Sequence, residues 1–171
     1  MVVNGWRLFA HPLFTQQLER LTAQVEALAA KGVATYRDQP ATKLLATIRR
    51  YILEIIPRDP NAAAFRQGNT LGQDNRHWFR AKFHERYRLF YRFSSGNKVI
   101  IYAWVNDEDS LRKAGAKTDP YTIFRNMLVS GNPPSNMGEL MSASKEIPQT
   151  DSAMGSSSQK GKTKKQARRK T

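Results

Sequence analysis

Cysteine is absent from the 171 residues of this chain. Without cysteine there is no disulfide, no thiolate metal ligand and no cysteine nucleophile. Histidine is scarce, with three residues, and no two of them have the His-x-x-x-His spacing of a metalloprotease helix. The sequence also has no Gly-rich phosphate loop and no Gly-x-Ser-x-Gly motif, which excludes P-loop nucleotide hydrolases and serine hydrolases of that type.

Metal and cofactor sites are therefore not expected. The adjacent acids Asp107, Glu108 and Asp109 are the one group that could hold a divalent ion. Three neighbouring carboxylates rarely converge on one ion without further ligands, so a solvated acidic loop is the favoured interpretation.

Long apolar runs are missing as well. No stretch approaches the roughly 20 apolar residues that span a bilayer. The segment Met1 to Trp6 has neither the charged region nor the apolar region of a signal peptide. We therefore expect a soluble cytoplasmic protein that does not associate with membranes.

Acidic residues are outnumbered, with 14 Asp and Glu against 28 Lys and Arg, for a formal net charge of +14. Such an excess favours a polyanionic partner, most often nucleic acid. From residue 142 onward the chain is rich in Ser, Gly, Gln and Lys and cannot bury enough apolar surface to fold. We predict a folded domain over 1–141 and a disordered basic tail over 142–171, which either adds affinity for nucleic acid or only improves solubility.

Apolar residues at helical spacing predict three helices. The first begins at His11-Pro12 and ends near Gly32, and the second runs from about Pro40 to Ile56. A final helix follows Asp119-Pro120 and covers Tyr121 to about Val129. The stripes of the first two helices are Phe14, Leu18, Leu21, Val25 and Leu28, and Leu44, Leu45, Ile48, Ile52 and Ile55.

The stretch from Trp78 to Trp104 consists of three runs dense in aromatic and β-branched residues, separated by His84-Glu85 and by a Ser-Ser-Gly-Asn turn. This pattern predicts a three-stranded antiparallel meander, and residues 62–67 could add an edge strand. Val3 to Phe9 predicts a short strand or an extended arm. The whole is an α+β domain in which helices cover the apolar face of the sheet and leave the other face open.

That open face is expected to carry cations and aromatic rings, because side chains alternate along a strand. Between Arg76 and Arg92 the only acid is Glu85. A surface of one charge sign set among rings suits a phosphate backbone with bases to stack on the rings. A plain solvated sheet face is the alternative. The residues of this face are Trp78, Arg80, Lys82, Arg86, Arg88, Phe90 and Arg92.

Cleavage of RNA fits this composition, because the 2′-hydroxyl is a nucleophile beside its own phosphodiester. Arg and Lys stabilise the charge that develops on the phosphoryl oxygens, and Lys or Tyr can transfer protons. Arg80, Lys82 and Arg88 supply these groups without histidine or metal.

The strand Arg80-Ala-Lys82 followed by Arg-Tyr-Arg-Leu-Phe-Tyr-Arg resembles the RelE/ParE superfamily of bacterial toxins, and within it the YhaV toxin family. The resemblance extends from about Val3 to Pro134 and excludes the tail. The segments that carry it are Val3-Asn-Gly-Trp6, Ala10-His-Pro12, Ala41-Thr-Lys-Leu-Leu45, Arg86-Tyr-Arg-Leu-Phe90, Asn106-Asp-Glu108, and Lys117-Thr-Asp119 followed by Tyr121.

The resemblance implies a RelE/ParE-like fold and a type II toxin that cleaves mRNA at the ribosome. It also implies a cognate AbrB-like antitoxin of the PrlF type, with which the toxin binds promoter DNA. Carried over by position, catalytic roles fall on Arg80, Lys82, Arg88 and Tyr121. A fourth cation is unassigned, with Arg112 and Lys117 as the candidates.

Contacts to RNA beyond the catalytic residues are expected from Trp78, Arg86, Phe90, Arg92, Arg112 and Lys117. Two other functions suit the same cationic face: a ParE-like toxin that acts on a protein target without catalysis, and a nucleic-acid-binding module.

Overall fold

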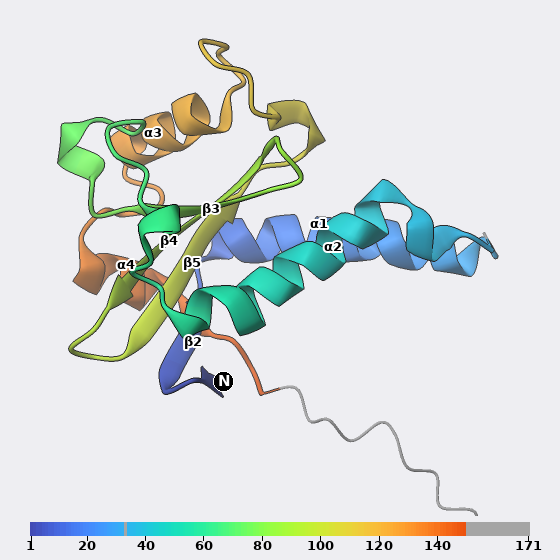
Figure 1. The fold of residues 1–171 in the computed structure, drawn as a ribbon, viewed down its shortest axis with the longest axis horizontal. Coiled ribbons are helices and arrows are strands. Elements are labelled where there is room, and N and C mark those ends of the chain that lie inside the picture. Colours follow the sequence, from blue (N-terminus) through green and yellow to red (C-terminus); the bar gives the residue numbers. More distant parts are fainter. Residues whose placement is uncertain (33, 150–171) are drawn as a thin grey trace, which may run out of the picture.

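The computed structural model describes residues 1–32 and 34–149, which form a mixed six-stranded sheet with helices on both faces (Figure 1). The strand order is β1-β2-β5-β4-β3, and β6 pairs with β2 on the same edge as β1, next to Phe9 and Ala10. The strands are β1 (Val2–Val3), β2 (Trp6–Ala10), β3 (Phe79–Phe83), β4 (Tyr87–Ser94), β5 (Val99–Val105) and β6 (Lys145–Glu146).

The predicted meander is confirmed, since β3 pairs with β4 and β4 with β5 in antiparallel register. The predicted strand near the N-terminus is β2, which runs parallel to β5. That pairing makes β5 a central strand, and all seven of its residues are buried. A continuous apolar run such as Val99–Val105 is typical of a strand with both faces covered.

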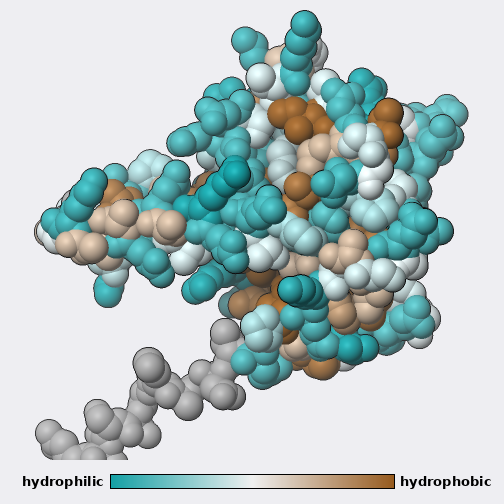
Figure 2. Space-filling model, turned by 180° about the vertical axis from the view of Figure 1, so that it is seen from behind, coloured by the Kyte–Doolittle hydropathy of each residue, from teal (hydrophilic) through white to brown (hydrophobic). Residues whose placement is uncertain are grey.

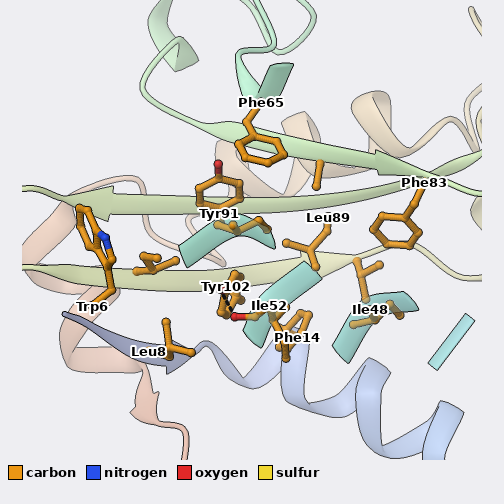
Figure 3. Packing of buried hydrophobic residues seen from close by; sticks show 14 of the residues in the cluster. Trp6, Leu8, Phe14, Ile48, Ile52, Phe65, Phe83, Leu89, Tyr91 and Tyr102 are labelled. Atoms are coloured by element: carbon orange, nitrogen blue, oxygen red, sulfur yellow. Dashed lines mark hydrogen bonds between the residues drawn. The ribbon is translucent and has the colours of Figure 1, made fainter. Parts of the chain in front are cut away.

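Helices α1 (Pro12–Ala30) and α2 (Pro40–Arg50) cover one face of the sheet, as predicted. The second helix continues through a π turn, η2 (Tyr51–Ile55), and a 3-10 turn, η3 (Ile56–Arg58), so its predicted end near Ile56 is confirmed. Figure 3 shows the core between these helices and the sheet, where the hydroxyl of Tyr102 donates to the carbonyl of Ile52 at 2.6 Å.

The other face of the sheet is covered too, by α3 (Pro120–Ser130) and α4 (Met137–Ala143). The expectation of an open second face was therefore wrong. A second core forms there, in which the ring of Phe90 stacks on Phe124 at 4.3 Å and Trp78 meets Phe124 edge to face at 5.0 Å. Burial of each such ring contributes roughly 1.5–3 kcal/mol, so this second core also stabilises the fold.

The ordered chain continues past the boundary predicted at residue 141. Residues 142 and 143 complete α4, and β6 pairs with β2. Glu146 also forms an ion pair with Arg7 at 2.8 Å. The start predicted for the tail was therefore too early, and the remainder of that prediction, 150–171, lies outside the described residues.

Residues 62–67 do not form the suggested edge strand. They contain a 3-10 turn, η4 (Ala63–Phe65), and then a single bridge from Arg66 to Phe79.

Helices α1 and α2 project beyond the sheet as an arm (Figure 1). Figure 2 shows that the surface of this arm is a mixture of hydrophilic and weakly hydrophobic residues. None of the helices in the described part of the chain has the length and apolar character to cross a membrane.

Candidate functional site

Two arginines from neighbouring strands meet at one tyrosine hydroxyl. The Nε of Arg80 on β3 donates to the Tyr121 oxygen at 2.8 Å, and the Nε of Arg88 on β4 donates to it at 3.1 Å. Tyr121 lies in the first turn of α3, whose N-cap is Asp119. Three of the four residues predicted to be catalytic are therefore brought into direct contact.

Both arginines are buried, with 7% of each residue exposed. The expectation that their head groups face solvent was wrong, because α3 lies over this part of the sheet. A buried charge is tolerated when its donors are paired, and several are. Arg80 Nη1 donates to the Ala64 carbonyl at 2.9 Å, and Arg88 Nη1 donates to the carbonyls of Glu85 and Tyr87 at 2.9 and 2.8 Å.

One donor group on each guanidinium is left over. Within the described residues, the Nη2 atoms of Arg80 and Arg88 have no hydrogen-bond partner, and neither is fully buried. These two groups are therefore available to an oxygen that approaches from solvent. The rest of each guanidinium is held in place, so binding a ligand would require little reordering.

Lys82 lies next to this pair on the same face of β3 as Arg80. In the register of the two strands it is directly opposite Arg88, as expected. Its side chain is exposed and has no hydrogen bond or ion pair to any described residue. Lys82 is thus the exposed cation of the group, beside two buried and hydrogen-bonded ones.

The turn between β3 and β4 positions Arg88. His84 and Glu85 have positive φ values of 45° and 58°, which is uncommon for residues with a side chain. The turn is held from both sides, since His84 Nε2 lies 2.8 Å from the Thr47 hydroxyl on α2 and Arg88 binds the Glu85 carbonyl. The contact with Thr47 therefore gives His84 a structural role in the turn.

Of the two candidates for the fourth cation, Arg112 lies beside Tyr121. Its guanidinium carbon lies 4.9 Å from the centre of the Tyr121 ring, within cation–π distance. Its Nη1 forms an ion pair with Asp119, whose side chain is 3% exposed. Asp119 also accepts from the backbone N–H groups of Lys113 at 2.8 Å and Tyr121 at 3.2 Å. Lys117, the other candidate, is exposed on the loop, and its side chain makes no hydrogen bond or ion pair to a described residue.

The predicted RNA-binding residues divide into two groups. Trp78 and Phe90 are fully buried in the second core, so their proposed role as stacking platforms for bases was wrong. Arg92 is half-buried over the Trp78 ring and donates to the Ser135 carbonyl, and this burial lowers its pKa. Arg86 is exposed, and its Nε donates to the Arg112 carbonyl at 3.2 Å.

Sequence reasoning missed two residues that hold the site together. Asp119 was assigned only as a helix cap, and its ion pair with Arg112 depends on the fold of the loop. The buried Asn106 accepts from the Arg88 backbone N–H at 2.7 Å and donates to the carbonyls of Arg86 and Ser110. One indication of this role was present in the sequence, because Asn106 belongs to the Asn106-Asp-Glu108 segment that carries part of the family resemblance.

The acidic loop at residues 107–109 contains a short turn that Asp107 organises. Asp107 caps the short turn η6 (Glu108–Ser110) and accepts from Gln17 at 3.1 Å. Among the described residues no group of His, Cys, Asp and Glu has the arrangement of a metal site. A cavity of about 490 Å³ lies between α1, α2 and this loop, and none of the residues predicted to be catalytic lines it.

The site therefore brings together two buried, hydrogen-bonded guanidiniums and one phenol, beside the exposed ammonium of Lys82. Such a group suits a tetrahedral or trigonal-bipyramidal oxyanion, since each arginine offers a donor from a rigid fork. Lysine and tyrosine add groups that can accept or release a proton.

Comparison with known proteins agrees with this chemistry. Residues 8–145 match the sequence model of the YhaV toxin family, described as a toxin with endonuclease activity, of a toxin-antitoxin system. Toxin YhaV of Escherichia coli O6:H1 (strain CFT073) is 47% identical over 146 residues, which cover 84% of this chain and 95% of that protein. The ribonuclease toxin YhaV of Escherichia coli K12 has the same identity and coverage. No solved structure matches. The chain belongs to the YhaV family of toxins.

Proposed function

We propose that this chain is a ribonuclease toxin that cleaves mRNA in the cytoplasm. The single observation that carries the proposal is the meeting of Arg80 and Arg88 at the Tyr121 hydroxyl, with Lys82 directly across the ladder from Arg88. The similarity to the ribonuclease toxin YhaV of Escherichia coli K12 supports the same activity.

In the proposed reaction the RNA 2′-oxygen attacks the adjacent phosphorus. The bond between the 2′-oxygen and phosphorus forms, and the bond from phosphorus to the 5′-oxygen of the next nucleotide breaks. One proton leaves the 2′-hydroxyl and one is given to the departing 5′-oxygen. The products are a 2′,3′-cyclic phosphate and a 5′-hydroxyl.

The residues divide this work between charge and protons. Arg80 and Arg88 bind the non-bridging oxygens through their Nη2 groups, which stabilises the charge of the transition state. Lys82 transfers a proton, with Tyr121 as its partner or rival, since the phenol oxygen is held by two donors that leave its own proton free. No step in this scheme requires a metal.

The test of the proposal is incubation of the purified protein with RNA, with and without ribosomes, in the presence of chelator. We expect cleavage that survives chelation and leaves 2′,3′-cyclic phosphate ends. A protein that binds RNA but never cleaves it would contradict the proposal and favour the nucleic-acid-binding module. A protein that does neither yet remains toxic would point to a ParE-like protein target.

Lys82→Arg separates proton transfer from simple binding. Arginine keeps the positive charge but does not lose its proton near neutral pH. We expect cleavage to collapse while RNA affinity persists. Lys43→Arg on α2, an exposed lysine away from Tyr121, is the matched control. Full activity of Lys82→Arg would restrict Lys82 to phosphate binding.

We further propose that a cognate PrlF-type antitoxin inhibits the toxin by placing an acidic segment over these cations, and that the complex binds promoter DNA. The exposed cations Lys82, Arg86, Lys113 and Lys117 lie on β3, at the β3–β4 turn and on the loop before α3, and opposite charge on a partner steers association. Hydrogen exchange with and without antitoxin tests this. Equal protection of residues 79–92 and 107–119 in both samples would reject it.

A further inference from the structure

A small hollow lies beside the proposed site, between the loop that precedes α3 and the first turns of that helix. Its volume is about 190 Å³, several times the ~30 Å³ that one water occupies. Residues that line it include Thr70, Arg112, Asp119, Tyr121, Thr122 and Arg125. Tyr121 belongs to both the hollow and the cation site, so an occupant of the hollow is adjacent to a phosphate bound by Arg80 and Arg88.

The hollow carries one uncompensated positive charge. Asp119 is engaged by Arg112, which leaves Arg125 as the free cation. Arg125 is four residues after Tyr121, so the two side chains lie on the same side of α3. Its side chain is exposed and makes no hydrogen bond or ion pair within residues 1–32 and 34–149. An exposed, unpaired guanidinium at the mouth of a polar hollow favours an anion.

A nucleobase fits the hollow less well than a phosphate does. Bases are usually held by stacking on an aromatic face, and the one ring here is Tyr121. The Arg112 guanidinium already lies over that ring, 4.9 Å from its centre. The Thr70 hydroxyl already donates to the Gln67 carbonyl at 2.9 Å and to its side-chain oxygen at 2.8 Å, so the donors for a phosphate in this hollow would come from Arg125.

We propose that this hollow binds the RNA phosphate next to the scissile one, with Arg125 as its principal contact. The inference rests on the proposed ribonuclease function, which defines the phosphate that is cleaved. It adds a second anchoring point, which fixes the direction of the strand across Tyr121. When two adjacent phosphates are bound, the nucleotide between them is held in one orientation. Orientation of the reacting groups accounts for a large part of the rate acceleration in many enzymes.

The test uses short RNA oligonucleotides with a single cleavage position, in which one phosphate at a time is replaced by a neutral methylphosphonate. For the wild-type protein we expect kcat/KM to fall most at the scissile phosphate and to fall roughly threefold to tenfold at one neighbouring linkage. In Arg125→Gln the unmodified RNA should lose about the same factor, and the neighbouring methylphosphonate should then cause no further loss. Arg49→Gln, an exposed arginine on α2, is the matched control and should keep the wild-type pattern.

If the neighbouring methylphosphonate lowers kcat/KM as much in Arg125→Gln as in the wild type, the proposal is overturned. The contact to that phosphate would then come from another residue. Binding of the same series with 2′-O-methyl sugars is measured in parallel and needs no cleavage. An Arg125-dependent linkage in binding, without cleavage of the unmodified RNA, would support the hollow as a phosphate site and reject the ribonuclease proposal instead. Circular dichroism of each variant verifies that it is folded.

Discussion

The Nε of Arg80 donates a hydrogen bond of 2.8 Å to the hydroxyl oxygen of Tyr121, 41 residues later in the chain. This contact joins the edge strand β3 to helix α3. Because the Tyr121 oxygen also accepts from Arg88, one phenol sets the spacing between two guanidiniums. The structure of the candidate site therefore depends on this side chain more than on any other.

Tyr121→Phe removes the shared acceptor but keeps the ring. We expect cleavage of RNA to fall on the order of a hundredfold or more, as for the loss of an oxyanion donor. The free energy of unfolding should fall by about 1–3 kcal/mol, because two buried donors lose their partner. Single-turnover rates and urea unfolding measure the two effects. Tyr36→Phe, on the link between α1 and α2, is the control, and a Tyr121→Phe protein of wild-type activity would contradict the assignment.

Asp119→Asn keeps an oxygen for the helix cap but removes the charge that holds Arg112. The carboxylate accepts three hydrogen bonds in a site that is almost completely buried. We expect the variant to lose about 1–3 kcal/mol of stability and part of its activity, since Arg112 would be free to leave the Tyr121 ring. Urea unfolding is the measurement. Asp109→Asn, in an exposed position, should change stability little, and equal effects of the two substitutions would argue against a special role for Asp119.

Stability should depend on the protonation of His11. Burial holds the pKa of His11 below its ordinary value of 6.5, and its Nδ1 accepts from the Leu13 backbone N–H at the start of α1. The folded state therefore binds this proton less readily than the unfolded state. Stability is fully present above pH 6.5 and is lost as the pH falls from 6.5 toward the lower folded pKa.

Replacement of His11 by Asn tests that dependence, because Asn is a good N-cap that does not titrate. Urea unfolding between about pH 8 and about pH 5 should show a declining stability for the wild type and a flatter one for His11→Asn. The pKa of His77 is also lowered, by partial desolvation and then by the charge of Arg92. Because His77 is exposed overall, it should contribute less than His11 to the pH dependence of stability. If stability still declines with falling pH in His11→Asn but no longer does so in His77→Asn, the pH dependence belongs to His77 and not to His11.

Two truncations distinguish the C-terminal segments. Removal of 150–171 deletes the seven basic residues between Lys160 and Lys170. From composition we expect an unchanged melting temperature and a salt dependence of RNA binding that is shallower by roughly 0.7 per lost phosphate contact. Removal from residue 142 should also lower the melting temperature, since β6 and the Arg7–Glu146 ion pair are lost. Equal melting temperatures for the two truncations would show that β6 adds no stability.

Much of the fold was predictable because the signals are local. The stripe of α1 and the strand alternation of β4 each depend on residues within one element, and His84-Glu85 marks the turn between two strands. Helix α4 was missed because a seven-residue, partly polar segment has too few turns to show a periodic pattern.

The error over Trp78 and Phe90 has a different origin. A strand pattern tells which residues share a face, but it does not tell what covers that face. Rings beside arginines on one face are compatible with stacked bases and with a packed helix. In the folded chain α3 and α4 cover the rings, and Trp78 and Phe90 become core.

The sequence by itself determined the helices, the meander, the register that sets Lys82 opposite Arg88, and the choice of Arg80, Arg88 and Tyr121 as candidates. Those features follow from periodicity, turn residues and resemblance, each read along a single stretch of chain. Only the tertiary structure decided that the arginines are buried, that the Arg112 guanidinium lies over the Tyr121 ring, and that Asp119 forms an ion pair with it. These facts depend on how α3 packs against the sheet, and a contact between residues tens of positions apart leaves no local pattern in the sequence.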